Sequence, residues 1–549
     1  MINRMGLSPA YTRRRMEMIL IISSMVVGLV ILTAGMFSGE EGAASGLESP
    51  EVTAQASAMP GQGWAPLMVY YSAFGSHAQD AQIVRYEWDL DGNGQFDYDA
   101  TAQGGYANYL YSKPGDYTIT LQVTDDQGRF SSDSIQVSVR HPASSSVDYW
   151  TVFDDTRVRS IDILLQQADW DEMWADPEAK YQAMADAIIF DERMENVGFS
   201  MRGQFSMRVS GEKKPWKIDL DAFIDGQEYR NLRQLLLINN IGDPSMLREK
   251  LAYEMLAFAG LPASHVAFVE LWIDIIDDDE PINYWGVYTL VERVDNKYLS
   301  NRFGRDSKGG NLYKASHAQR GPMDLIYYGE NITDYPTQNG SYAYGKMNNI
   351  EENDYSDIVA LCRIVDGTQY ANEDELVQAL ESAINVDSFL RYLAVITILD
   401  NWDAYPNTGN NYYLFNNLLS KRYEWIPWDM AWGENAQASL FPTSGSELIQ
   451  RAPLLDQVFG VEGYRSQYLA YVDLLLRYWF NTENISEQAE RYYDLIAPYW
   501  IKATGDKAFF GNQPMFPIEV SENSWVSLVN FASNRNQFLR EALATEMQP

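Results

Sequence analysis

The chain has 549 residues, of which 76 are acidic and 41 basic, and its formal net charge is −35. A surface this acidic repels a phosphate backbone, so the composition excludes nucleic acid as a partner. Hydrophobic residues make up 46% of the chain, which indicates folded domains rather than disorder. Because Cys362 is the sole cysteine and the four histidines are scattered, any metal is expected to be a hard cation bound by oxygen, such as Mg, Mn or Ca.

The N-terminus carries a targeting signal. A run of three arginines at 13–15 precedes an apolar stretch at 16–37, and roughly 20 apolar residues are enough to span a bilayer as a helix. We therefore expect a cytoplasmic N-terminus at 1–15, a transmembrane anchor at 16–37, and a single-pass protein of the cell membrane whose C-terminal bulk is extracellular. The alternative is a cleaved signal peptide, because small residues around Ala34 suit a peptidase.

A flexible linker is expected at 38–50, and short alternating strands follow it. Residues 117–123 and 135–139 alternate with a period of two, each after a turn signal, which predicts a small β-sandwich over residues 51–141. With its Tyr86–Gly94 segment and its Pro-Gly-Asp-Tyr strand entry, this region resembles the PKD domain, an immunoglobulin-like extracellular module. The resemblance implies a spacer or adhesive role at the cell surface.

The same region contains a segment that resembles a calcium-binding loop. Four oxygen-bearing side chains follow the spacing of such a loop: Asp89, Asp91, Asn93 and Asp97. Position 12 of the loop would be Ala100, where a bidentate glutamate is required. We therefore expect a polar turn, with calcium at the PKD domain as the alternative.

A Ser-rich linker at 142–150 leads into one large mixed unit at 151–549. The pattern predicts a helix at 246–259. The preceding Asp243-Pro-Ser sequence can cap its N-terminus, and Gly260 is expected to end the helix. The hydrophobic patterns predict further elements, namely strands at 159–163, 266–272 and 284–291 and helices at 463–480 and 485–500. The fold class expected from this order is α+β, with a helical C-terminal part.

A cationic segment lies early in this unit. Residues 201–220 are predicted to form a strand, a turn and a second strand that Lys213, Lys214 and Lys217 enter. A phosphate site needs such a cation, positioned by a carboxylate on a neighbouring helix, and Glu249 suits that role. The alternative is that the three lysines are solvated charges at the end of a strand.

Two carboxylates stand in dense aromatic and polar settings. Asp403 follows Asn401-Trp402, and Asp429 follows Trp-Ile-Pro-Trp, with Asn411 between them in the sequence. A Mg-nucleotide site needs one carboxylate to orient and deprotonate an acceptor hydroxyl, and a second carboxylate that holds the metal together with an amide oxygen. The alternative is a turn-rich loop whose Asn and Asp side chains satisfy their own backbone.

Taken together, these stretches resemble the CotH family of spore-coat protein kinases, from about Ile161 to the C-terminal helices. The motifs that carry the resemblance are Arg202-Gly203, Lys214–Lys217, Asp243–Tyr253, Tyr284–Tyr288 with Glu292 and Asp295, Asn401–Asp403, Asn411–Leu414 and Trp425–Asp429. The resemblance implies an atypical protein-kinase-like fold that binds ATP with Mg or Mn and phosphorylates secreted proteins on Ser or Thr. It assigns Asp403 as the catalytic acid/base, and Asn411 and Asp429 as the metal ligands.

The resemblance also assigns the contacts to the nucleotide phosphates. Lys214 or Lys217 would neutralise them, with Glu249 as the ion-pair partner and Arg202 as a further candidate; the sequence does not separate the two lysines. Family members often carry a second Asp or Asn two residues after the metal aspartate, and here that position is Ala431. The Gly-rich loop and the Asp-Phe-Gly motif of ordinary kinases are also absent from the sequence.

The leading hypothesis is a membrane-anchored extracellular kinase that transfers the ATP γ-phosphate to Ser or Thr of surface or secreted proteins. A catalytically silent adhesion or envelope-structural protein is the alternative, which the PKD module and the acidic exterior favour and the retained Asp403, Asn411 and Asp429 oppose. A third hypothesis is a different nucleotide-dependent transfer on the same scaffold.

Overall fold

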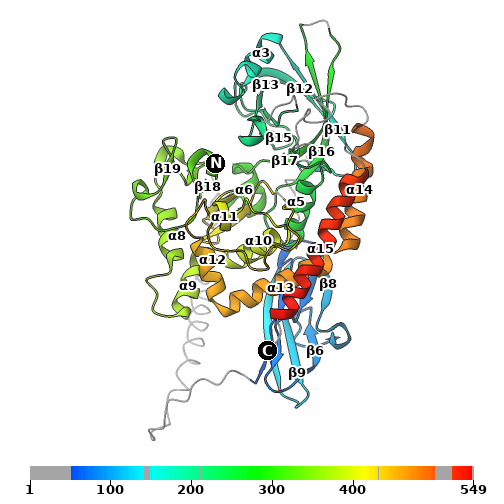
Figure 1. Cartoon of the computed structure of the whole chain (residues 1–549), viewed down its shortest axis with the longest axis vertical. Helices are drawn as coiled ribbons and strands as arrows, with labels where there is room; N and C mark the ends of the chain where they lie inside the picture. The colour runs from blue at the N-terminus through cyan, green and yellow to red at the C-terminus, as the bar shows by residue number, and fades with distance from the viewer. Residues whose placement is uncertain are drawn as a thin grey trace, which may run out of the picture. The chain divides into compact units, whose positions relative to one another are not determined.

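The computed structural model describes residues 51–140, 149, 151–208, 213–277, 280–307, 309–430, 432–500 and 522–546. The expected membrane anchor, the linker at 38–50, most of the linker at 142–150 and Ala431 lie outside these residues. In the part of the chain that is described, we find no helix long and apolar enough to cross a membrane. The described fold is mixed α+β, with a β-rich N-terminal region and a largely helical C-terminal part (Figure 1).

Residues 51–140 form a β-sandwich around a core that includes Tyr71 and Trp88. One sheet has the strand order β3-β10-β9-β6-β7 and the other β2-β4-β8, while β1 pairs with β5. β9 and β10 contain the two predicted strands and pair in antiparallel register. The strands are β1 (Val52–Thr53), β2 (Ser57–Met59), β3 (Gln62–Trp64), β4 (Leu67–Ser72), β5 (His77–Ala78), β6 (Ile83–Asp89), β7 (Tyr98–Asp99), β8 (Ala107–Tyr111), β9 (Gly115–Asp125) and β10 (Phe130–Arg140).

The segment with calcium-loop spacing is a tight turn after β6. The carboxylate of Asp89 accepts hydrogen bonds from the backbone N–H groups of Gly92 and Gly94, at 2.8 and 2.7 Å. Asp91 accepts another from the N–H of Asn93 at 3.1 Å. The first two acidic residues of the segment therefore act as backbone acceptors within the turn.

A closed barrel follows the sandwich, with the strand order β11-β12-β13-β14-β15-β17-β16. β11 and β16 run parallel where the barrel closes, and the other neighbours pair antiparallel. Trp216 and Ile218 fill the interior with other buried side chains, so the alternation of a strand directs Lys217 outward. The strands are β11 (Arg159–Leu165), β12 (Ala183–Ile189), β13 (Glu192–Met201), β14 (Trp216–Asp219), β15 (Gln234–Ile238), β16 (Val266–Ile275) and β17 (Asn283–Glu292).

The remaining strands form small sheets among helices, and one sheet has the order β21-β18-β22-β23. Its strands are β18 (Leu312–Lys314), β21 (Gly345–Lys346), β22 (Tyr412–Asn417) and β23 (Arg422–Pro427), and β19 (Thr337–Gln338) pairs with β20 (Ser341–Tyr342). The helices are α3 (Gln167–Ala175), α4 (Phe205–Arg208), α5 (Arg248–Phe258), α6 (Asn296–Phe303), α7 (His317–Arg320), α8 (Ser356–Asp366), α9 (Glu373–Ala383), α10 (Val386–Ile398), α11 (Tyr405–Thr408), α12 (Pro453–Gly460), α13 (Glu462–Tyr478), α14 (Thr482–Trp500) and α15 (Glu522–Glu546).

The predicted strands and long helices are present, with two local differences. The segment between β13 and β14 was expected to be a plain turn, but it contains the short helix α4. The predicted helix at 246–259 begins at Arg248, because Met246 has a positive φ of 59° and cannot continue a right-handed helix. Its end agrees with the prediction, since Gly260 follows with a φ of 75°.

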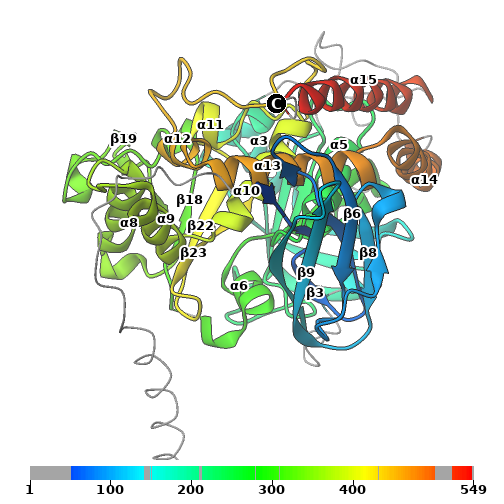
Figure 2. The ribbon, with the colours of Figure 1, turned by 90° about the horizontal axis from the view of Figure 1, so that it is seen from below.

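The β-sandwich is packed against the helical part, and α13 lies beside its strands in both views (Figures 1 and 2). Met59 of β2 is completely buried in the hydrophobic core that contains α5, α10 and α13. The ring of Tyr70 packs 4.5 Å from that of Tyr478, centroid to centroid. The Tyr106 hydroxyl donates to Asp473 at 2.7 Å. The sandwich is therefore more than a tethered spacer, because it shares a core with the large unit.

Candidate nucleotide and metal site

The β22–β23 hairpin brings Asn411 and Asp429 together at its open end. Tyr412 pairs with Pro427, and the backbone N–H of Trp428 donates to the carbonyl of Asn411 at 3.2 Å. Asn411 and Asp429 both adopt left-handed backbone conformations, with φ of 60° and 52°. Asn and Asp tolerate this region better than other side chains, and here it turns both residues out of the strand direction at the same point.

Two asparagine amides orient Asp403. The Nδ2 groups of Asn410 and Asn411 donate to its carboxylate, at 3.2 Å to Oδ1 and 2.9 Å to Oδ2. The backbone N–H of Asp403 donates to Asn401 Oδ1 at 3.2 Å. The loop thus satisfies part of its own backbone, as the alternative interpretation required. It also fixes the carboxylate beside the open end of the hairpin.

Asp429 is accessible to solvent, yet nearby groups strongly affect its ionisation. Desolvation raises the pKa of its carboxyl group, Arg202 opposes that rise, and the Asp403 charge adds to it. Its backbone N–H donates to the Tyr253 hydroxyl of α5 at 3.2 Å. An accessible carboxylate that protein groups nonetheless desolvate is suited to bind a cation.

Glu249 and Arg202 complete the charged centre. Glu249 lies in the first turn of α5, where burial raises its pKa to about 8; Asp429 adds to that rise and Arg202 opposes it. Arg202 directly follows β13, and its backbone N–H donates to the carbonyl of Pro215 at 3.0 Å. The cation within electrostatic reach of both Glu249 and Asp429 is therefore Arg202.

The structure separates the lysines of the cationic segment from Glu249. Lys214 donates from Nζ to the carbonyl of Met207 at 2.9 Å, and Lys217 forms an ion pair with Asp219 at 3.2 Å. Lys213 and Lys214 are both buried, so the interpretation of the three lysines as solvated charges is wrong for these two. Of the two lysines expected to pair with Glu249, neither does so in the described contacts.

Lys314 is a cation of this site that the sequence reading missed. Its Nζ lies 5.4 Å from the ring centroids of both Tyr413 and Trp428, which hold it by cation–π contacts. Desolvation lowers its pKa to about 8, and Arg202 also lowers it, whereas Asp429 favours the charged form. Lys314 therefore belongs to the same charged centre as Arg202 and Asp429.

Lys180 is a second missed cation. It follows the short 3-10 helix Pro177–Ala179, with a φ of 52°. Desolvation lowers its pKa, and the charges of Arg202 and Lys217 lower it further. Arg202 and Lys217 therefore both lie within electrostatic reach of Lys180. Positive charge around Lys180 in a chain of net charge −35 can attract an anion.

The residues of this site fit a hard divalent cation. The carboxylate of Asp429 and the amide oxygen of Asn411 are oxygen ligands, the kind that Mg and Mn prefer. Among the described residues there is no cluster of three His, Cys, Asp or Glu side chains placed to form a full metal cage. A small protein ligand set is typical of a Mg site that a substrate's phosphates and water complete.

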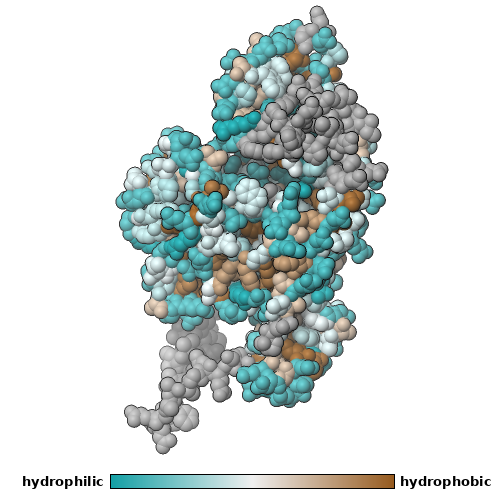
Figure 3. Space-filling view, in the orientation of Figure 1, coloured by the Kyte–Doolittle hydropathy of each residue, from teal (hydrophilic) through white to brown (hydrophobic). Residues whose placement is uncertain are grey.

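An exposed tryptophan adjoins Asp403. Figure 3 shows a face covered mainly by hydrophilic residues, with hydrophobic groups scattered among them. Trp402 is 60% exposed although it immediately precedes a half-buried aspartate. Large aromatic side chains supply contact area at low entropic cost, so Trp402 leaves an exposed aromatic surface beside Asp403.

Substituting Lys213 by methionine is expected to stabilise the fold in a pH-dependent way. Burial lowers the pKa of Lys213 to about 7, from 10.5 in an unfolded chain. Between these values the native state binds fewer protons than the unfolded state, so wild-type stability rises with pH over this window. Lys213→Met should be more stable than wild type by about 1–3 kcal/mol at pH 7, with the gap closing toward pH 10. Urea unfolding at three pH values measures it.

The control is Lys113→Met, which removes an exposed lysine of the sandwich and should leave the stability unchanged at every pH. A difference between Lys213→Met and wild type that stays constant from pH 7 to pH 10 would contradict the proposed titration.

Two protein families match the chain. A family described as "CotH kinase protein" matches residues 199–539, more than half of the sequence. A PKD domain family matches residues 49–139. The inner spore coat protein H of Bacillus subtilis (strain 168) is 27% identical over 230 residues, which cover 41% of this chain and 56% of that protein. The chain therefore matches only about half the length of that relative, and both predicted family resemblances are confirmed.

Two solved structures of PKD domains also match part of the chain. The PKD1 domain of the Vibrio cholerae metalloprotease PrtV is 30% identical, with 16% of this chain and 95% of that chain covered and a TM-score of 0.13. The PKD1 domain of Vibrio anguillarum Epp is 28% identical, with 17% and 100% covered and a TM-score of 0.14. Both are PKD domains, and both cover only a small share of this chain.

Proposed function

Because this chain belongs to the CotH kinase protein family, we propose that it is an ATP-dependent protein kinase that phosphorylates Ser or Thr of surface or secreted proteins. The observation that carries the proposal is the meeting of residues from separate segments in one charged centre. These residues are Arg202 after β13, Glu249 on α5, Lys314 on β18, Asp403 after α10, and Asn411 and Asp429 at the ends of the hairpin.

In the proposed mechanism, the carboxylate of Asp403 accepts a hydrogen bond from the acceptor hydroxyl. The hydroxyl oxygen attacks the γ-phosphorus in line, the bond from that phosphorus to the ADP oxygen breaks, and the hydroxyl proton passes to Asp403. Asn410 and Asn411 hold the carboxylate in position for this transfer. Fixed orientation of the base is what such a loose transition state requires from the protein.

The remaining charged groups act on the phosphates. Arg202 and Lys314 would offset the negative charge of the transferring group, and their electrostatic proximity to Asp429 supports this role. Mg or Mn, held by Asp429 and Asn411, would neutralise the phosphate oxygens and orient them. Glu249 would position Arg202, because the two lie within electrostatic reach of each other.

We further propose that the kinase works outside the cell on a membrane anchor. The arginine run and the apolar stretch at 16–37 support this location, as does a PKD module next to them in the sequence. The alternative is a catalytically silent surface protein on the same scaffold. The absence of a second acidic residue at Ala431 favours it, since a metal ligand expected in relatives is missing there.

The test incubates residues 51–549 with MnCl₂ and γ-labelled ATP and compares wild type with Asp429→Asn. Wild type should label itself or a protein acceptor and show a nucleotide-dependent rise in melting temperature. Asp429→Asn should lose labelling by about 100-fold or more, because the metal on the phosphates is lost. Asp306→Asn, which changes an exposed aspartate elsewhere, is the matched control.

The three hypotheses give different results in this test. A nucleotide-dependent shift without labelling would indicate a nucleotide-binding pseudokinase. Neither a shift nor labelling would remove the kinase proposal in favour of adhesion. Transfer of a group other than phosphate, seen as an increase in acceptor mass that does not match a phosphoryl group, would support the third hypothesis.

A further inference from the structure

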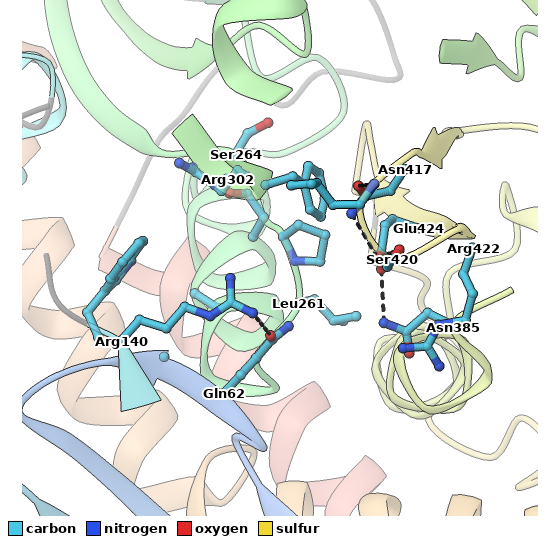
Figure 4. Close-up of a pocket in the computed structure, with 18 of the residues that line it drawn as sticks. Gln62, Arg140, Leu261, Ser264, Arg302, Asn385, Asn417, Ser420, Arg422 and Glu424 are labelled. Carbon is cyan, nitrogen blue, oxygen red and sulfur yellow. Dashed lines mark hydrogen bonds between the residues drawn. The ribbon is translucent and has the colours of Figure 1, made fainter. Parts of the chain in front are cut away.

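A pocket of about 640 Å³ lies where the PKD sandwich meets the large unit (Figure 4). Its walls come from the ends of β3 and β10, the segment 260–265 after α5, the end of α6, the N-cap of α10, and the turn between β22 and β23 with the strand residues next to it. The volume is within the usual range for small-molecule sites. Neither family match assigns a ligand to this place.

The polar lining of the pocket includes a buried carboxylate that accepts three hydrogen bonds from neutral side chains. Glu424 is 8% exposed, and it accepts hydrogen bonds from Asn385 at 2.9 Å, Asn417 at 3.2 Å and Ser420 at 3.0 Å. Asn417 lies on β22, Ser420 in the turn between the strands, and Asn385 at the N-cap of α10, while Glu424 itself lies on β23, so the network fixes one wall of the pocket. Such a wall is built in advance of a ligand, which lowers the entropic cost of binding.

The other charged groups of the lining are arginines. Arg302 forms an ion pair with the buried Glu292 at 2.7 Å, so its charge is offset. Arg140 donates to Gln62 Oε1 at 3.3 Å, and within the described residues neither Arg140 nor Arg422 forms an ion pair with an acidic side chain. Figure 4 places these two arginines on opposite sides of Leu261. The pocket is therefore locally cationic in a chain of net charge −35.

The lining also offers surfaces for a ring-shaped ligand. Trp64 lines the pocket and is 36% exposed, and Leu261 and Phe303 add apolar surface. Arginine recognises carboxylates through two parallel N–H donors, and aromatic faces pack against flat, partly apolar ligands. From this combination we infer that the pocket binds an acidic saccharide, with its carboxylates held by Arg140 and Arg422.

This site is separate from the nucleotide site and is joined to it by rigid elements. The hairpin carries Asn411 and Asp429 at one end and the pocket residues at the other, and its strands of six residues span about 20 Å. α5 carries Glu249 at its start and leads into the pocket wall after its eleven residues, about 16 Å further on. Ligand binding at the pocket therefore does not require a functional kinase, and the inference is independent of the proposed function.

Isothermal titration calorimetry of residues 51–549 tests the inference with three probes: trigalacturonate, neutral maltotriose and phosphoserine. Trigalacturonate should bind, and maltotriose at least about 10-fold more weakly, because only the former has carboxylates for the arginines. Arg140→Gln and Arg422→Gln should each lower the affinity for trigalacturonate by about 10-fold or more. Arg85→Gln, which changes an exposed sandwich arginine outside the pocket, should leave it unchanged.

The outcomes separate this inference from the kinase proposal. Binding that persists in Asp403→Asn, with the same loss in the pocket variants, supports a site of its own. Equal binding of maltotriose, binding of phosphoserine in preference to trigalacturonate, or no binding of any probe would each overturn the acidic-saccharide assignment. An affinity for trigalacturonate that Arg140→Gln and Arg422→Gln leave intact would place the ligand elsewhere and overturn it too.

Discussion

Replacing Asp403 by asparagine is expected to reduce phosphoryl transfer by about 10³-fold, while the fold and nucleotide binding stay intact. The substitution keeps the size of the side chain but removes the group that accepts the acceptor's proton. One oxygen remains to accept from the amides of Asn410 and Asn411, so the loop keeps most of its hydrogen bonds. Initial rates with saturating Mn-ATP measure the loss, and nucleotide-dependent thermal shifts report binding.

The matched control for this prediction is Asp374→Asn, since Asp374 is an exposed aspartate in the first turn of α9. It should transfer phosphate at the wild-type rate. If Asp403→Asn kept more than about a tenth of the wild-type rate, Asp403 would not be the base that this chemistry needs. A loss of nucleotide binding together with activity would instead assign Asp403 to the metal and phosphate contacts.

Truncating Met59 to alanine should destabilise the whole protein by about 2–4 kcal/mol, because the change leaves a cavity in a fully buried position. Met59 belongs to the sandwich in sequence but to the core of α5, α10 and α13 in space. The loss should therefore appear in one cooperative transition that includes both units. Urea unfolding followed by tryptophan fluorescence and by far-UV circular dichroism measures it.

Met68→Ala is the control, because Met68 lies on the neighbouring strand of the same sheet and is 39% exposed. Its effect should stay within about 0.5 kcal/mol. Two separate transitions, or a loss below about 1 kcal/mol for Met59→Ala, would show that the sandwich folds and unfolds independently. In that event, the shared core would contribute little to stability.

Local patterns predicted much of the fold. The strands at 117–123 and 135–139 were readable because a half-buried strand alternates with a period of two. The helix before Gly260 was readable because glycine ends helices in the left-handed conformation. The family motifs also indicated Asp403, Asn411 and Asp429, and these residues do lie together.

The non-local part of the site could not be read in the same way. Lys314 belongs to it only because β18 pairs with β22, which lies about a hundred residues later in the chain. Arg202 replaces Lys214 and Lys217 beside Glu249 because a closed barrel sets which strand end approaches α5. Neither relation leaves a periodic signal in the sequence, so spacing favoured the lysines.

No sequence pattern predicted that the β-sandwich packs against the helical part. Met59 and Tyr70 resemble ordinary residues of a small β-module, and the surface that they meet on α13 is assembled only after folding. The pocket at this junction is a product of the same docking. The membrane anchor and the cytoplasmic N-terminus stay predictions, since they lie outside the described residues.

The left-handed backbone at Asn411 and Asp429 bears on how related sequences are compared. At φ values of 60° and 52°, glycine, asparagine and aspartate are far easier to accommodate than other residues. The backbone conformation of the hairpin alone can therefore select for Asp or Asn at these two positions, even in a relative that has lost catalysis. A relative that retains both residues need not be active, whereas Asp403 has no positive φ to preserve it and is the better marker of a working enzyme.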